Sequence, residues 1–188
     1  MAEPKKQARR FALPARRTSA IHRRMNSRRK LIDLGRLPEW RAELRQQGKR
    51  LVVTNGCFDL LHVGHVSYLE AARNLGDALL VGVNGDDAVR KLKGPGRPLN
   101  SERDRAAVLA GLESVDGVCI FPEPRATEFL KLAEPDVYVK GGDYTIESLN
   151  SEERAMVEAF KGRIVLLPFV AGKSTTGLLE RLSNEVEL

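Results

Sequence analysis

Short apolar runs alternate with helical patterns along most of the chain, from residue 51 onwards. The apolar runs have the length of buried strands, and the segments between them show the spacing of amphipathic helices. This alternation is typical of a parallel sheet whose strands are joined by crossover helices. We therefore predict an α/β fold with a doubly wound, five-stranded parallel sheet. The predicted strands are residues 51–55, 78–84, 117–121, 136–140 and 163–168.

Apolar residues recur at helical spacing between the predicted strands. Val66, Leu69 and Ala72 form one such stripe, and Val108 and Leu109 belong to another. We expect these stripes to pack against the sheet as ordinary crossover helices. The predicted helices are residues 64–75, 101–112, 127–133, 151–160 and 174–182.

The first thirty residues carry 11 Lys and Arg against one acid, with almost no hydrophobic periodicity. We predict that residues 1–30 form a disordered basic leader. A solvated tail, an organelle transit peptide and a nucleic-acid-binding arm share this composition, and translation starting at Met25 would remove most of it. We favour the options without a binding role over the nucleic-acid-binding arm. Residues 31–50 should form a helical extension with Trp40 and Leu44 on one face, before the folded domain of residues 51–188.

Composition and charge exclude several classes of protein. The chain has 188 residues, 42% of them hydrophobic, which supports one domain with a real core. Its longest apolar run, residues 164–170, is much shorter than the ~20 residues that span a bilayer, so we expect no membrane segment. Cys57 and Cys119 are far apart, which argues against a disulfide scaffold and favours the cytoplasm.

Residues 1–50 carry 16 basic and 4 acidic side chains, whereas the remainder carries 15 and 21. The formal charge of +6 therefore comes from the N-terminal part alone.

The loop after the first predicted strand carries most of the candidate chemistry. Ligands of doubly wound sheets bind beyond the carboxyl ends of the strands. Here TNGCFDLLHVGH places two of the three histidines, His62 and His65, at the start of a helix, where exposed N–H groups favour a phosphate. A plain helix cap, or a zinc site of Cys57 with both histidines, would also fit the spacing. We favour a catalytic role for the histidines and assign no metal ligand.

The segment GCFDLLHVGH resembles the signature of the HxGH nucleotidyltransferases, which include the cytidylyltransferases. The segments VGVNGDDAVRKLKGPGRPLN, RAAVLAGLESVDGV, PDVYVKGGDY and GKSTT are similar, in order and spacing, to those of adenylyltransferases that make ADP-heptose. The resemblance covers residues 51–182 and implies a Rossmann-like fold of the nucleotidyltransferase type. It implies transfer of AMP from ATP to heptose 1-phosphate, with release of pyrophosphate.

Three other functions remain as alternatives to that activity. One is a CTP-dependent cytidylyltransferase acting on glycerol 3-phosphate or another polyol phosphate. Another is a non-catalytic RNA-binding protein that acts through the basic leader. Class I aminoacyl-tRNA synthetases carry a similar histidine motif, but their catalytic and tRNA-binding parts need a longer chain than 188 residues.

A basic segment follows the second predicted strand, where six Lys and Arg surround a Gly-Pro-Gly turn in residues 90–105. We expect a flexible loop that neutralises the phosphates of two substrates, although a solvated basic loop is the plainer interpretation. By resemblance, Lys93 would reach the phosphates and act with His62 and His65 in catalysis. The implied substrate-binding residues are Arg97, Arg105, Lys140 and Asp143, the last of which could equally cap a turn.

The nucleotide is expected to contact the first loop and the start of the last helix. Hydroxyls and amides at that helix start would bind the outer phosphates. The family's transfer is direct, with a sugar phosphate oxygen attacking the α-phosphorus of ATP and with Mg²⁺ on the phosphates. A separate sugar kinase would supply the acceptor, and relatives commonly form homodimers. The implied nucleotide-binding residues are Thr54, Asn55, Gly56, Phe58, Asp59, Gly64, Ser174 and Thr175.

Overall fold

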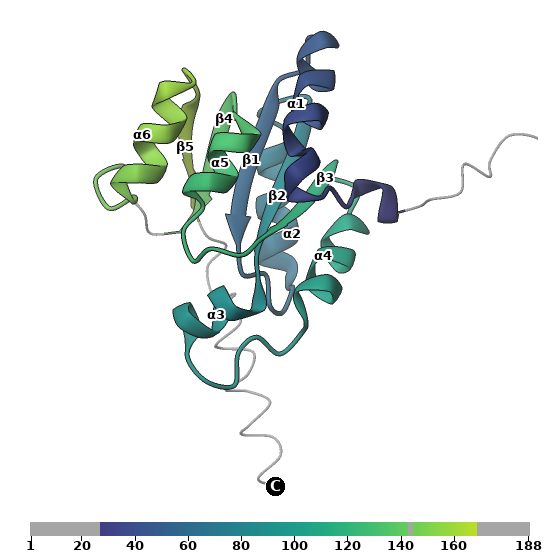
Figure 1. The fold of residues 1–188 in the computed structure, drawn as a ribbon, viewed down its shortest axis with the longest axis vertical. Helices are drawn as coiled ribbons and strands as arrows, with labels where there is room; N and C mark the ends of the chain where they lie inside the picture. Colours follow the sequence, from purple (N-terminus) through teal and green to yellow (C-terminus); the bar gives the residue numbers. More distant parts are fainter. Residues whose placement is uncertain (1–26, 143–144, 169–188) are drawn as a thin grey trace, which may run out of the picture.

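The computed structural model describes residues 27–142 and 145–168, and this part of the chain contains a sheet of five parallel strands (Figure 1). Their order across the sheet is β3-β2-β1-β4-β5. The prediction of the sheet is confirmed, and each strand end lies within one residue of its predicted position. The strands are β1 (Leu51–Gly56), β2 (Ala78–Asn84), β3 (Gly117–Phe121), β4 (Val137–Gly141) and β5 (Arg163–Leu167).

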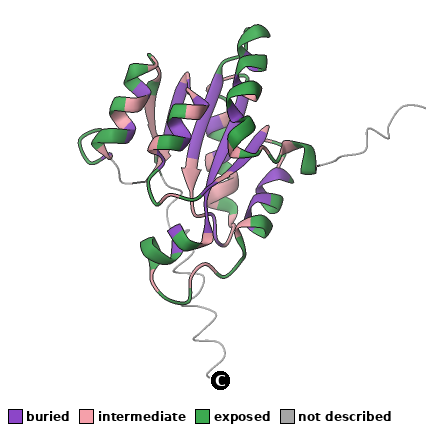
Figure 2. Cartoon of the chain, viewed as in Figure 1, coloured by how far each residue is buried: buried purple, intermediate pink, exposed green. Residues whose placement is uncertain are grey.

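Helices cover both faces of the sheet and give a three-layer α/β/α arrangement (Figure 1). One face packs against α1 (Leu37–Gln46), α5 (Thr127–Ala133) and α6 (Ser151–Ala159). The other face packs against α2 (Val63–Arg73) and α4 (Glu102–Ala110). The central strands are buried almost throughout (Figure 2), as expected for a parallel sheet covered on both sides. The doubly wound α/β prediction is therefore confirmed.

The strand order reverses beside β1. The chain first adds β2 and β3 on one side of β1 and then crosses to add β4 and β5 on the other side. All pairings are parallel, so the carboxyl ends of the strands lie at one edge of the sheet. The crevice between the ends of β1 and β4 is the usual ligand position in such sheets.

Two features of the helices differ from the sequence-based expectation. Residues predicted as a flexible basic loop begin with a helix, α3 (Asp86–Lys93), which starts directly after β2. This helix lies below the carboxyl edge of the sheet in Figure 1 and buries only Ala88 and Val89. In α4, Val108 is 56% exposed and the predicted stripe is wrong there, because the buried face includes Arg105 and Leu109.

The N-terminal extension lies against the outer strand β3. Two short 3-10 helices, η1 (Ser27–Lys30) and η2 (Leu34–Arg36), precede α1. Leu31 pairs with Val118 of β3, and the N–H of Ile32 donates to the Val118 carbonyl at 2.8 Å. Residues 27–30, the last four of the predicted basic leader, form η1, and the Lys30 ammonium donates to the Leu112 carbonyl at 2.8 Å. The rest of that leader and the predicted helix at 174–182 lie outside the described residues.

Acidic side chains occupy the amino-terminal edge of the sheet. Asp136 accepts the Leu51 N–H at 2.6 Å and the guanidinium of the buried Arg41 at 2.9 Å. Asp116 likewise accepts the Leu79 N–H at 2.8 Å and pairs with Arg73. These carboxylates satisfy the first N–H groups of the strands, so this edge is closed by hydrogen bonds. Within the described residues, no helix has the length and apolar character required to cross a membrane.

Candidate active site

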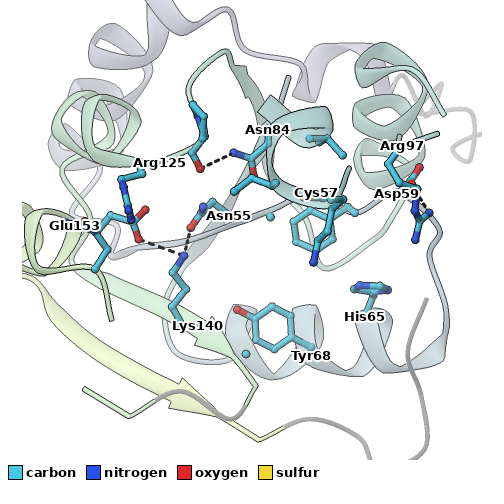
Figure 3. Close-up of a pocket in the computed structure, with 18 of the residues that line it drawn as sticks. Asn55, Cys57, Asp59, His65, Tyr68, Asn84, Arg97, Arg125, Lys140 and Glu153 are labelled. Carbon is cyan, nitrogen blue, oxygen red and sulfur yellow. Dashed lines mark hydrogen bonds and ion pairs between the residues drawn. The ribbon is translucent and has the colours of Figure 1, made fainter. Parts of the chain in front are cut away.

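A cleft of about 950 Å³ opens at the carboxyl edge of the sheet (Figure 3). Its walls come from the loop after β1, the start of α2, helix α3, the end of β4 and the start of α6. We distinguish two ends, which lie on opposite sides of Figure 3. The histidine end contains His62, His65, Asp59 and Arg97, and the α6 end contains Asn55, Lys140, Ser148 and Glu153.

The two histidines lie together at the first turn of α2. His62 is the N-cap residue, with extended backbone angles, and its carbonyl accepts the His65 N–H at 2.9 Å. The two rings lie in contact, with centroids 4.0 Å apart and planes tilted by 34°. Both line the cleft beside the helix N-terminus, where backbone N–H groups and the helix dipole favour an anion. The structure thus brings together the two histidines that the sequence singled out.

His65 is a neutral hydrogen-bond donor at pH 7. Burial, and then the neighbouring His62, lower the pKa of His65 to about 4. Its Nδ1 accepts the backbone N–H of His62 at 3.4 Å, which leaves the proton of the neutral ring on Nε2. A negative phosphate beside this ring would favour the charged form and raise the pKa again. The imidazole can therefore donate a hydrogen bond whose strength increases as negative charge develops.

Asp59 fixes the loop that follows α3. Its carboxylate forms an ion pair with Arg97 at 2.5 Å and accepts the N–H groups of Leu99 and Asn100 at 2.8 and 3.1 Å. Asp59 and Arg97 both line the cleft, but each already has a charged partner. Their predicted roles in binding nucleotide and substrate stay predictions. The loop itself is anchored to the first loop rather than freely flexible.

Arg105 has a position that the sequence did not predict. Its side chain is 0% exposed, and its guanidinium donates to the carbonyls of Cys57 and Asn84, at 2.5 and 2.8 Å. It also donates to the Asn100 carbonyl and pairs with Asp86. We expected Arg105 to orient the substrate, but it does not line the cleft. It acts as a buried cross-link between the loops after β1 and β2.

A connected set of polar side chains forms the α6 end of the cleft. Asn55 Oδ1 accepts from the Lys140 ammonium at 2.9 Å and lies 2.7 Å from the Tyr138 hydroxyl. Glu153 Oε2 lies 3.0 Å from that hydroxyl and 3.3 Å from Lys140 Nζ. Tyr138 and Lys140 point to the same face because side chains two apart on a strand do so. The predicted residues Asn55 and Lys140 are therefore held by two residues that the sequence did not indicate.

Glu153 is an ionised carboxylate despite its burial. Burial alone would raise the pKa of Glu153, but the Lys140 ammonium and hydrogen bonds from the Ala126 N–H and the Tyr138 hydroxyl lower it below its usual range. The Ala126 N–H reaches the other carboxylate oxygen at 2.8 Å. Both oxygens of Glu153 are thus held, and its negative charge has a fixed position.

Four cations and two carboxylates line the cleft. Asp59 and Glu153 pair with one cation each, whereas within the described residues Lys93 and Arg125 pair with no carboxylate. Lys93 was predicted as a phosphate contact and lines the cleft from the end of α3. Arg125 was missed, although its position soon after β3 marks it by the same rule that marked the first loop.

The remaining predicted residues fall into three groups. Gly56, Phe58 and Gly64 line the cleft, and Phe58 has a left-handed backbone (φ +47°) that is unusual for a large side chain. Thr54 is buried and does not line the cleft. Its hydroxyl shares a hydrogen bond of 2.7 Å with the hydroxyl of Tyr68, which does line it. Outside the described residues lie Asp143, Ser174 and Thr175.

The described residues offer no set of carboxylates for a tightly held metal. No group of three or more His, Cys, Asp or Glu side chains among them could hold an ion. Cys57 lines the cleft, and burial, above all, raises the pKa of its thiol, which disfavours the thiolate that a metal would need. Magnesium commonly binds through substrate phosphates and few protein ligands, so the described residues would accommodate Mg²⁺ as part of a bound triphosphate.

The chain is similar in sequence to curated proteins from bacteria. The chain is 50% identical over 143 residues to the bifunctional protein HldE of Syntrophotalea carbinolica and 47% identical over 164 residues to that of Trichlorobacter lovleyi. These matches cover 76% and 87% of the chain, but only 29% and 33% of the relatives. The chain therefore spans about a third of the length of the curated relatives it matches.

A solved structure has a similar fold, and a family model matches a range of residues that includes the first loop. The lipopolysaccharide core biosynthesis protein from Thermoplasma volcanium matches with a TM-score of 0.54 and 26% identity. That match covers 65% of this chain and 98% of the Thermoplasma chain. A model described as cytidylyltransferase-like matches residues 53–176, which include the cleft-lining loops after β1, β2 and β4. The chain therefore belongs to the cytidylyltransferase-like family.

Proposed function

We propose that this chain is an adenylyltransferase that transfers AMP from ATP to heptose 1-phosphate and releases pyrophosphate. The observation that carries the proposal is the pair His62 and His65 at the N-terminus of α2, facing a cleft with excess positive charge. Such a site suits phosphates that carry several negative charges. The identity to HldE proteins, at 50% and 47%, supports the choice of a heptose phosphate and adenine.

The reaction needs positioning and charge stabilisation more than acid–base chemistry. The acceptor phosphate is already an anion at pH 7 and attacks the α-phosphorus directly, so one P–O bond forms while the bond to pyrophosphate breaks. His65 Nε2–H would donate to a non-bridging α-phosphate oxygen, with His62 beside it. Lys93 would stabilise charge on the leaving pyrophosphate. Binding both substrates in one cleft supplies the orientation that the reaction requires.

Further assignments complete this proposal. Ser174 and Thr175 would hold the outer phosphates of ATP, and Asp143 would accept hydrogen bonds from sugar hydroxyls. Mg²⁺ would enter with the triphosphate and neutralise part of its charge, and Arg97 would be available only by exchanging Asp59 for a phosphate. The enzyme would act in the cytoplasm, with a sugar kinase supplying the acceptor and with a second copy of the chain as its partner in a homodimer.

Pyrophosphate release measured with purified protein tests the proposal. ATP and CTP are each combined with heptose 1-phosphate and with glycerol 3-phosphate, in the presence of Mg²⁺. We expect release only with ATP and heptose 1-phosphate. In His65→Ala, turnover should fall by about 10²-fold or more, because one preorganised donor to the transition state is lost.

Two outcomes would contradict the proposal. Release with CTP and glycerol phosphate would keep the direct-transfer mechanism but assign a cytidylyltransferase. Unchanged turnover in folded His65→Ala, checked by its circular dichroism spectrum, would remove the histidine from the reaction. His22, which is far from the first loop in sequence, provides the matched control as His22→Ala, for which we expect wild-type turnover.

A further inference from the structure

The charges of the cleft are arranged unevenly between its two ends. The histidine end lies beside a helix N-terminus, and the cleft-lining Lys93 pairs with no carboxylate in the part of the chain that the structure describes, so this end favours anions. At the α6 end, the positive charge of Lys140 is balanced by the negative charge of Glu153. Both side chains are mostly buried, at 15% and 8% exposed. The two ends of one cleft therefore suit different chemical groups.

Glu153 cannot move away from the cleft without losing several contacts. One carboxylate oxygen accepts the Ala126 N–H at 2.8 Å, and the other lies 3.0 Å from the Tyr138 hydroxyl. Its own backbone N–H donates to the Asn150 side chain at 3.0 Å, at the start of α6. A ligand group that enters the α6 end thus meets a fixed negative charge in a setting where solvent screening is weak.

The other polar groups at this end are neutral donors and acceptors. The Asn84 amide, which is part of the cleft lining, donates to the Glu123 carbonyl at 3.0 Å. Ser148 and Asn150 add a hydroxyl and an amide to the lining. Hydroxyl groups can donate to and accept from such a set, whereas a phosphate dianion, the main form at pH 7, has no proton to donate to Glu153.

We propose that Glu153 is a specificity-determining residue that admits sugar monophosphates and rejects acceptors with a second phosphate. This inference rests on the proposed function, in which the reacting phosphates occupy the histidine end. The hydroxyl-bearing part of the acceptor is assigned to the α6 end, where Lys140 is a predicted substrate-binding residue. Without the Glu153 charge, Lys140 together with the exposed Arg125 would attract a second phosphate there. Repulsion of the wrong ligand is a general means of specificity.

Inhibition constants for two sugar phosphates test this inference. Glucose 1-phosphate and glucose 1,6-bisphosphate are used as competitors of heptose 1-phosphate, and the ratio of their inhibition constants is compared between variants. In Glu153→Gln the ratio should shift about tenfold in favour of the bisphosphate. In Lys140→Met, which leaves the carboxylate unpaired, it should shift in the opposite direction. The double variant restores neutrality and should return the ratio to the wild-type value.

Glu152→Gln is the matched control, because it removes the same charge from an exposed neighbour on α6 that does not line the cleft. Its ratio should equal that of wild type. An unchanged ratio in Glu153→Gln, or an equal shift in Glu152→Gln, would overturn the inference, as would a rise in the KM for ATP alone. If Glu153→Gln does not fold, the direction of the shift in Lys140→Met decides whether the inference holds.

Calorimetric binding of both glucose phosphates gives the same ratio without turnover. A failure of the proposed reaction can therefore be told apart from a failure of this inference.

Discussion

The two edges of the sheet use similar side chains for different purposes. At the amino edge, Asp136 and Asp116 accept strand N–H groups and pair with Arg41 and Arg73, so the polar groups there satisfy one another. At the carboxyl edge, the ion pairs are separated from one another, and they line an open cleft of about 950 Å³. Ion pairs can thus close one end of a domain and shape an open site at the other. Changes at the amino edge should affect stability alone, and changes at the carboxyl edge should affect activity.

The largest expected effect comes from substituting Arg105, because this residue should affect both stability and activity. Arg105→Ala removes donors from three backbone carbonyls and leaves Asp86 without its partner. We expect a loss of about 3–5 kcal/mol in the free energy of unfolding, because buried acceptors remain unpaired. Urea denaturation measures this loss, and turnover should fall with it since the loops after β1 and β2 line the cleft. Arg105→Lys keeps the charge but not the planar fork, and a fully stable lysine variant would contradict the role assigned to the guanidinium.

A smaller effect is expected at the opposite edge. Arg41→Met removes the hydrogen bonds to the Glu134 carbonyl and to Asp136, so the protein should lose about 1–3 kcal/mol of stability. Its kcat and KM, measured well below the melting temperature, should equal those of wild type. Arg45→Met is the control, because that arginine is half exposed and its pair with Glu134 should contribute about 0–1 kcal/mol. A change in KM caused by Arg41→Met would contradict the prediction that changes at the amino edge affect stability alone.

The smallest expected effect is a dependence of stability on pH through His65. Its pKa in the folded protein, about 4, lies below the ordinary value of 6.5, so between these values the unfolded state binds more protons. The stabilising contribution is complete above pH 6.5 and decreases as the pH falls towards 4. The melting temperature of wild type should therefore fall more steeply over this range than that of His65→Gln. An NMR titration of the His65 ring gives the pKa directly, and a value near 6.5 would refute the effect of burial.

Much of the fold was predictable because the apolar runs of the strands are short and clearly bounded. Helix α3 was not, since its segment DDAVRKLK has few apolar residues and its charges suggested a loop. The charge of Arg105 likewise suggested a substrate contact, and only the packed structure shows that four acceptors surround it. Periodicity identifies which residues are apolar, but not which charged residues are buried with partners.

The cleft was predictable where its residues are contiguous and missed where they are not. The first loop presents Asn55, His62 and His65 within one short segment, so their grouping is visible in the sequence. Glu153 is 13 residues beyond Lys140 and joins it only through the return of α6 to the sheet, as the ion pair shows. Asn84 ends a predicted strand at the carboxyl edge, and that position alone was a signal that could have identified it.

The pairing of Leu31 with Val118 has a consequence for how the protein behaves in concentrated solution. An outer strand with unpaired N–H and C=O groups is a template on which other chains can add and aggregate. The segment around Leu31 and Ile32 shields part of β3 from such contacts. A shortened protein starting at Leu37 would keep every described wall of the cleft, yet its outer strand would be more open to self-association. Expression and storage of the domain therefore benefit from keeping the residues that precede α1.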